Sequence, residues 1–130
     1  MTNDFAPRLL LVDDDPLALE AMRLTLEANG FMCHTAENGL EALTNLRQTL
    51  PDIVISDLRM PKMSGFELIP IIRRCYPQIP VIVSSAEPLH NSESERLPMS
   101  SYLQKGSYSS DELIATIFKV APHLMGYPAK

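Results

Sequence analysis

Residues 8–15, Arg8-Leu9-Leu10-Leu11-Val12-Asp13-Asp14-Asp15, have the pattern of a buried β-strand that is followed directly by three aspartates. The arrangement recurs at residues 52–57, Asp52-Ile53-Val54-Ile55-Ser56-Asp57, where a β-branched run again ends in aspartate. Short, continuous apolar runs are typical of strands that are covered on both faces, as in parallel sheets. These two stretches therefore predict a parallel sheet with acidic residues at the carboxyl ends of its strands.

The rest of the chain alternates between strand-like and helix-like patterns. Helical spacing of apolar residues predicts helices over 16–29, 40–50, 66–76 (distorted at Pro70) and 111–124, and further strands over 31–36, 81–86 and 102–104. Residues 87–101 are polar and contain Pro98, so we expect a short or irregular fourth helix there. Five buried strands alternating with helices predict an α/β fold with helices on both faces of the sheet.

Composition excludes several classes of protein. A chain of 130 residues predicts one domain, residues 1–130, with its core over about 8–124. The net charge of −5 argues against direct nucleic-acid binding. Two distant cysteines exclude a disulfide scaffold. No apolar run approaches the ~18 residues of a membrane span, and the N-terminus lacks the pattern of a signal peptide. We therefore expect a cytoplasmic protein.

Charged and hydroxyl side chains follow the predicted strands at one edge of the sheet. Ligand sites of open α/β sheets lie beyond the carboxyl ends of the strands. Asp13, Asp14 and Asp57 should meet there, with Lys105 and one of two serines, Ser84 or Ser85, since strand alternation lets only one of them face the site. Crowded carboxylates repel one another, and oxygen ligands of this kind favour Mg²⁺.

The chain resembles the response-regulator receiver domain of two-component signalling. The resemblance is carried in order by four motifs and covers about Arg8 to Leu124: Leu10-Leu11-Val12-Asp13-Asp14-Asp15-Pro16, Ser56-Asp57-Leu58-Arg59-Met60-Pro61-Lys62-Met63-Ser64-Gly65, Pro80-Val81-Ile82-Val83-Ser84-Ser85-Ala86 and Tyr102-Leu103-Gln104-Lys105. It implies a flavodoxin-like (βα)5 doubly wound sheet of five parallel strands in the order 2-1-3-4-5.

The resemblance also implies roles for individual residues. Asp57 would accept a phosphoryl group from a sensor histidine kinase or a phosphotransfer protein. Mg²⁺ would be held by Asp13, Asp14, Asp57 and the backbone carbonyl of Arg59. Ser85 would bind a phosphoryl oxygen, Lys105 would pair with Asp57 or its phosphate, and Tyr102 would be the aromatic switch. Their sequence context favours Ser85 over Ser84, because Ser85 directly precedes Ala86.

The implied activity is that of a signalling switch rather than of an enzyme. The domain would catalyse its own phosphorylation and dephosphorylation and act through contacts with an unidentified effector protein, with a homodimer as one option for its output. A second hypothesis is a pseudo-receiver, an interaction scaffold that is not phosphorylated. A third, an aspartyl phosphohydrolase, is disfavoured because Arg59 stands where such enzymes carry a second aspartate, and a flavin-binding version of the fold lacks a phosphate-binding loop after the first strand.

Two features depart from the family pattern. Gly106 follows Lys105, where the family usually has proline after a cis peptide bond. A cis bond before a non-proline residue costs ~2.5–4 kcal/mol, so we expect a trans or mobile loop and a less tightly positioned Lys105. Arg59 and Glu87 each lie two residues past a site residue, and we expect them to pair across the mouth of the site and screen it from the attacking water, unless they are simply two exposed charges.

Overall fold

The computed structural model describes residues 6–88 and 97–126. It contains a parallel five-stranded sheet in the order β2-β1-β3-β4-β5. The strands are β1 (Arg8–Val12), β2 (Met32–Ala36), β3 (Ile53–Ser56), β4 (Val81–Ser85) and β5 (Ser101–Gln104). The strand order and the parallel pairing confirm the predicted doubly wound fold.

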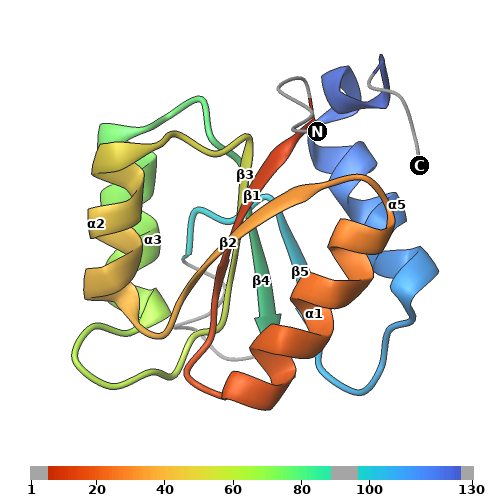
Figure 1. Cartoon of the computed structure of the whole chain (residues 1–130). Helices are drawn as coiled ribbons and strands as arrows, with labels where there is room; N and C mark the ends of the chain where they lie inside the picture. The colour runs from red at the N-terminus through yellow and green to blue at the C-terminus, as the bar shows by residue number, and fades with distance from the viewer. Residues whose placement is uncertain (1–5, 89–96, 127–130) are drawn as a thin grey trace.

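Helices cover both faces of the sheet (Figure 1). On one face lie α2 (Gly39–Gln48) and α3 (Gly65–Cys75), and on the other lie α1 (Pro16–Ala28) and α5 (Ser110–Val120), with a 3-10 turn, η1, at Pro122–Gly126. The predicted fourth helix falls largely on residues 89–96, which are outside the described part of the chain.

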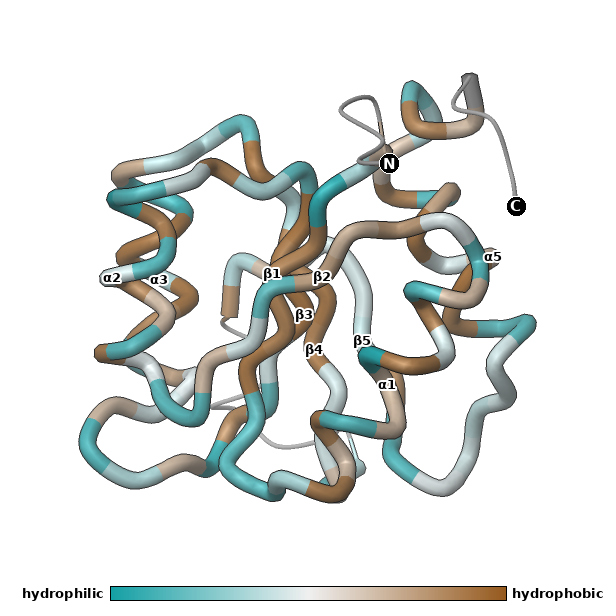
Figure 2. Tube along the Cα trace, viewed as in Figure 1, coloured by the Kyte–Doolittle hydropathy of each residue, from teal (hydrophilic) through white to brown (hydrophobic). Residues whose placement is uncertain are grey.

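Two apolar clusters hold these layers together, one on each face of the sheet. Alternate residues of β1 and β3 point to opposite faces, so Leu10 and Val54 pack with α2 and α3, whereas Leu9 and Ile53 pack with α1 and α5. All four side chains are at most 2% exposed. Figure 2 shows the resulting concentration of hydrophobic residues along the central strands.

The helix ends differ from the sequence prediction by a few residues, for local reasons. Gly39 is not part of a turn but the first residue of α2, because the Asn38 side chain caps the helix by accepting a hydrogen bond from the Glu41 N–H. The last helix ends at Val120 rather than Leu124, since Pro122 disfavours a helical residue before it. Helix α3 continues through Pro70.

Candidate phosphoryl-transfer and metal site

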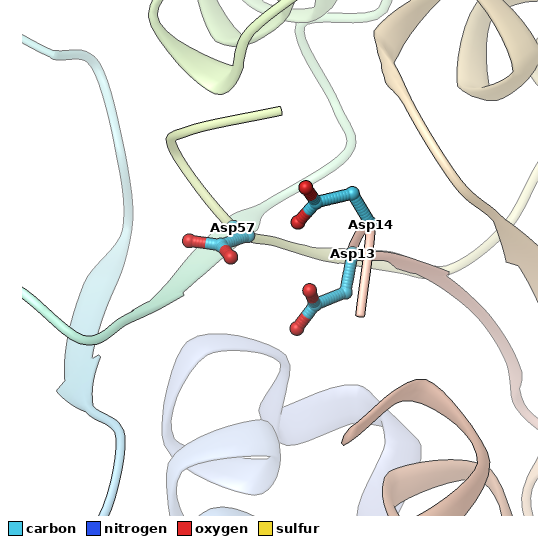
Figure 3. A group of neighbouring side chains, drawn as sticks. All are labelled: Asp13, Asp14 and Asp57. Carbon is cyan, nitrogen blue, oxygen red and sulfur yellow. The ribbon is translucent and has the colours of Figure 1, made fainter. Parts of the chain in front are cut away.

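Three aspartates meet where β1 and β3 end, as the sequence predicts (Figure 3). The two strands are parallel neighbours with Val12 opposite Ser56, so the residue that follows each strand lies at the same edge. The Asp57 N–H donates to the Val12 carbonyl at 2.8 Å and extends this pairing. Carboxylate oxygens of Asp13, Asp14 and Asp57 lie within 4.8 Å of one another.

Lys105 follows β5, the edge strand next to β4, and its side chain reaches the same point. Its backbone N–H donates to the Ser85 carbonyl at 2.7 Å, which fixes the start of the loop after β5 against β4. Its Nζ donates to Asp13 Oδ2 at 2.6 Å and to Asp57 Oδ2 at 2.9 Å. The two carboxylate side chains are 8% and 12% exposed, so the ammonium forms two largely buried ion pairs.

One ammonium faces three carboxylates at this site, so negative charge is in excess. Burial raises the pKa of Asp57 above its usual range, even though hydrogen bonds from Lys105 and from the Leu58 N–H oppose the rise. Burial lowers the pKa of Lys105, but its hydrogen bonds to Asp13 and Asp57 outweigh burial, and the net shift is upward. The shift of Asp57 thus reflects the cost of a charged carboxylate in a partly buried place, and the shift of Lys105 reflects its two carboxylate partners.

The donor set fits a hard divalent cation. It consists of carboxylate oxygens from Asp13, Asp14 and Asp57, and Asp14 is exposed to solvent whereas Asp13 is buried. Backbone N–H groups orient two of these carboxylates: Asp15 donates to Asp13 Oδ1 at 2.9 Å, and Leu58 donates to Asp57 Oδ1 at 2.7 Å. A divalent cation that prefers oxygen ligands, such as Mg²⁺, would offset the repulsion among these three carboxylates.

The two serines at the end of β4 lie on opposite faces of the sheet, and both are 2% exposed. Ser85 lies two residues after Val83 and so faces the same side as Val83, the side of α3. Its Oγ accepts a hydrogen bond from the Glu87 N–H at 3.2 Å. Ser84 lies two residues after Ile82 and so faces the side of α1 and α5. Its Oγ is 2.9 Å from the Tyr108 hydroxyl oxygen. Each hydroxyl therefore has its own partner.

Glu87 connects three of the residues predicted from the sequence. Its carboxylate pairs with the Arg59 guanidinium, with Arg59 Nη2 3.1 Å from Glu87 Oε1, and this confirms the predicted pairing across the mouth. The hydrogen bond from Arg59 lowers the pKa of Glu87. Its backbone carbonyl accepts a hydrogen bond from the Tyr102 hydroxyl, and its N–H donates to Ser85. The Arg59 guanidinium also lies 5.4 Å from the centre of the Phe66 ring.

Gly65 lets the start of α3 approach the strand that carries Asp57. Its N–H donates to the Leu58 carbonyl at 2.7 Å. A Cβ at this position would lie 2.2 Å from the Asp57 carbonyl oxygen and 2.9 Å from the Leu58 Cα. A side chain at position 65 would therefore push against the backbone of the proposed nucleophile.

Sequence reasoning missed Tyr108. A buried hydroxyl such as Ser84 requires a hydrogen-bond partner, so the alternation of Ser84 and Ser85 along the strand indicated that a partner exists. Nothing in the sequence indicated that the partner comes from the loop after β5.

In the described part of the chain, no helix is both long and apolar enough to span a membrane.

Comparison with known proteins points to one family. The model of the response regulator receiver domain matches residues 9–118. The response regulator MprA of Mycobacterium sp. (strain KMS) is 34% identical over 113 residues, which are 83% of this chain and 47% of that protein. The transcriptional regulatory protein GlrR of Escherichia coli (strain K12) is 46% identical over 78 residues, 60% of this chain and 18% of that protein. The chain thus spans less than half the length of these curated relatives.

Solved structures give the same result. The response regulator TrrA of Thermotoga maritima, solved in complex with Mg²⁺ and BeF, has a TM-score of 0.80 and 33% identity and covers 88% of this chain and 98% of its own. The chemotaxis response regulator CheY4 of Vibrio cholerae has a TM-score of 0.79 and 28% identity over the same shares of the two chains.

Proposed function

Because the chain belongs to the response-regulator receiver family, we propose that Asp57 accepts a phosphoryl group from the phosphohistidine of a sensor histidine kinase or a phosphotransfer protein. The observation that carries the proposal is the placement of Asp57 beside the half-buried Lys105 ammonium and two further carboxylates at the carboxyl edge of the sheet. An aspartyl nucleophile needs positioning and charge neutralisation more than it needs acid–base assistance.

The chemical step would form a bond between phosphorus and a carboxylate oxygen of Asp57 as the phosphorus–nitrogen bond of the donor breaks. The Leu58 N–H and the Lys105 ammonium fix the two carboxylate oxygens, and so they orient the nucleophile before the donor arrives. Lys105 also offers positive charge to the phosphoryl oxygens.

Mg²⁺ would be held by Asp13, Asp14 and Asp57, with the backbone carbonyl of Arg59 as a further ligand. When bound, the cation supplies charge neutralisation at the transferring phosphoryl group. The crowding of the three carboxylates supports this assignment, since their repulsion falls when a cation joins them.

The remaining site residues would report the phosphoryl group and control its lifetime. Ser85, whose Oγ accepts a hydrogen bond from the Glu87 N–H, would donate its hydroxyl hydrogen to a phosphoryl oxygen, and Tyr102, held by the Glu87 carbonyl, would respond to that new bond. The Arg59–Glu87 pair would shield the aspartyl phosphate from water.

The output would consist of protein contacts rather than turnover of a free metabolite. Residues 1–130 form one receiver domain in this proposal, acting in the cytoplasm on an effector protein, with homodimerisation as one route and with neither nucleic acid nor membrane as a direct partner. Phosphorylation would be self-catalysed, as would the slow dephosphorylation.

Intact mass spectrometry after incubation with acetyl phosphate tests the proposal. The expected result is one added phosphoryl group that depends on Mg²⁺ and is absent from Asp57→Asn. Absence of the adduct, while a kinase-competent receiver is labelled in the same buffer, would favour the alternative of a pseudo-receiver scaffold. Turnover of a generic phosphomonoester would instead indicate a phosphohydrolase.

A further inference from the structure

The loop that carries Lys105 makes few contacts along its middle. Gly106, Ser107 and Ser109 are exposed, and Tyr108 is the half-buried residue among them. Gly106 has a φ of +82°, and apart from Gly106 and its two chain neighbours no atom of the described chain lies within 4 Å of the place where its Cβ would be. Gly106 therefore makes no side-chain contacts that hold the loop, and it lacks the rigid ring that a proline at this position would provide.

Tyr108 ties this loop to β4. Its hydroxyl lies 2.9 Å from Ser84 Oγ, and its ring packs against the apolar cluster under α1 and α5. The neighbouring residue, Ser85, accepts the Lys105 N–H through its backbone carbonyl at 2.7 Å. Two consecutive residues of one strand thus hold the loop at two points, on either side of Gly106.

A cavity of about 320 Å³ lies beside the hydrogen bond between Ser84 and Tyr108. It is lined by Lys105 and Asp13 of the site, by Ser84 and Tyr108, and by Met22 of α1. The Lys105 side chain is 26% exposed and has a flexible stem, so this space gives the loop and its ammonium room to move.

We infer that the hydrogen bond between Ser84 and Tyr108 positions Lys105 for phosphoryl transfer to Asp57, taking over in this chain the constraint that Gly106 does not supply. Tyr108 is then a positioning residue, because it acts through Lys105 and touches neither the phosphoryl group nor Asp57. The inference rests on the proposed function of Asp57.

Removal of single hydroxyl groups tests it with little disturbance of packing. Tyr108→Phe and Ser84→Ala each break the hydrogen bond, and the double variant breaks it without leaving an unpaired partner. Tyr76→Phe is the matched control, since Tyr76 is also half-buried but lies at the C-terminal end of α3. The measured quantity is the rate of Asp57 phosphorylation by acetyl phosphate with Mg²⁺, followed by intact mass.

We expect each single variant to lower the rate about fivefold, the effect of losing one hydrogen bond, and the double variant to be no slower than the singles. Tyr76→Phe should match the wild type. In a Lys105→Ala background, Tyr108→Phe should change nothing, because the residue through which it acts is gone. A wild-type rate for Tyr108→Phe, or the same fractional loss in both backgrounds, would overturn the inference.

A second readout separates this inference from the proposed function. Nitrogen-15 NMR of the Lys105 Nζ reports how long its hydrogens stay protected from exchange, and it requires no phosphorylation. Faster exchange in Tyr108→Phe than in the wild type supports the positioning role even if wild-type Asp57 accepts no phosphoryl group. Unchanged exchange overturns it.

Discussion

Lys105→Met replaces the ammonium with an apolar side chain of similar length and should destabilise the metal-free protein. At an effective dielectric constant of about 20, a unit-charge pair at 2.6 or 2.9 Å is worth a gross attraction of about 6 kcal/mol. Pairs of carboxylate oxygens at 4.8 Å or less repel by at least about 3.5 kcal/mol each on the same scale. Without Lys105 the repulsion is unopposed at this edge of the sheet.

The net effect is smaller than these gross terms, because solvation changes oppose them. Breaking a buried ion pair by removing one partner typically costs about 3–5 kcal/mol. Since Lys105 is 26% exposed, we expect a loss of about 3 kcal/mol in the free energy of unfolding, or roughly 10 °C in Tm. Millimolar Mg²⁺ should recover much of this loss, and it should raise the Tm of Lys105→Met more than that of the wild type.

Thermal and urea unfolding at pH 7, with EDTA and with Mg²⁺, provide the measurement. Lys119→Met is the control, because Lys119 is an exposed lysine near the C-terminal end of α5. It should unfold like the wild type under both conditions. If Lys105→Met is as stable as the wild type in EDTA, or if Mg²⁺ raises both Tm values equally, the account of the site as a surplus of buried negative charge is refuted.

Three further substitutions test separate parts of the site. Asp57→Asn should be more stable than the wild type at pH 7 without Mg²⁺, because a carboxyl whose pKa is raised in the fold makes the native state less stable as the pH rises through that pKa. The difference in stability should vanish below about pH 4, where Asp57 is protonated in the folded and the unfolded chain, and unfolding curves across pH measure it. Gly65→Ala should lose about 1–3 kcal/mol by overpacking against the Asp57 carbonyl, and wild-type urea unfolding would contradict this. Arg59→Ala should leave stability within about 1 kcal/mol, because its ion pair is exposed, but it should speed loss of the phosphoryl group; an unchanged dephosphorylation rate would remove the shielding role.

The sequence was sufficient to predict the sheet and its acidic edge. Continuous apolar runs predicted the buried central strands, and the parallel arrangement then placed the residues after β1 and β3 together. Asp13, Asp14 and Asp57 meet as expected for this reason alone. The pairing of Arg59 with Glu87 was also predictable, since each lies two residues past a site residue, Asp57 or Ser85, at the ends of neighbouring strands.

Contacts that depend on how a loop folds were not predictable. The partner of Ser84 comes from the loop after β5, and no periodicity determines where Tyr108 points. The Lys105–Gly106 peptide bond is trans, as expected for a bond that does not precede proline. The sequence argument that Lys105 would therefore be loosely held did not include Tyr108, because tertiary hydrogen bonds of single loop residues have no sequence signature.

The period of two along β4 gives adjacent serines access to opposite sides of the sheet. Ser85 faces the cluster that contains Tyr102, and Ser84 faces the cluster that contains Tyr108. Each serine is linked to the tyrosine on its own side, Ser85 through Glu87 and Ser84 directly. The link from the Ser85 side chain to Tyr102 therefore lies on one face of the sheet, and the hydrogen bond between Ser84 and Tyr108 lies on the other. This separation predicts that Tyr102→Phe changes partner binding but not the phosphorylation rate, and that Tyr108→Phe changes the phosphorylation rate but not partner binding. The double variant should show both changes, each of the same size as in the single variant.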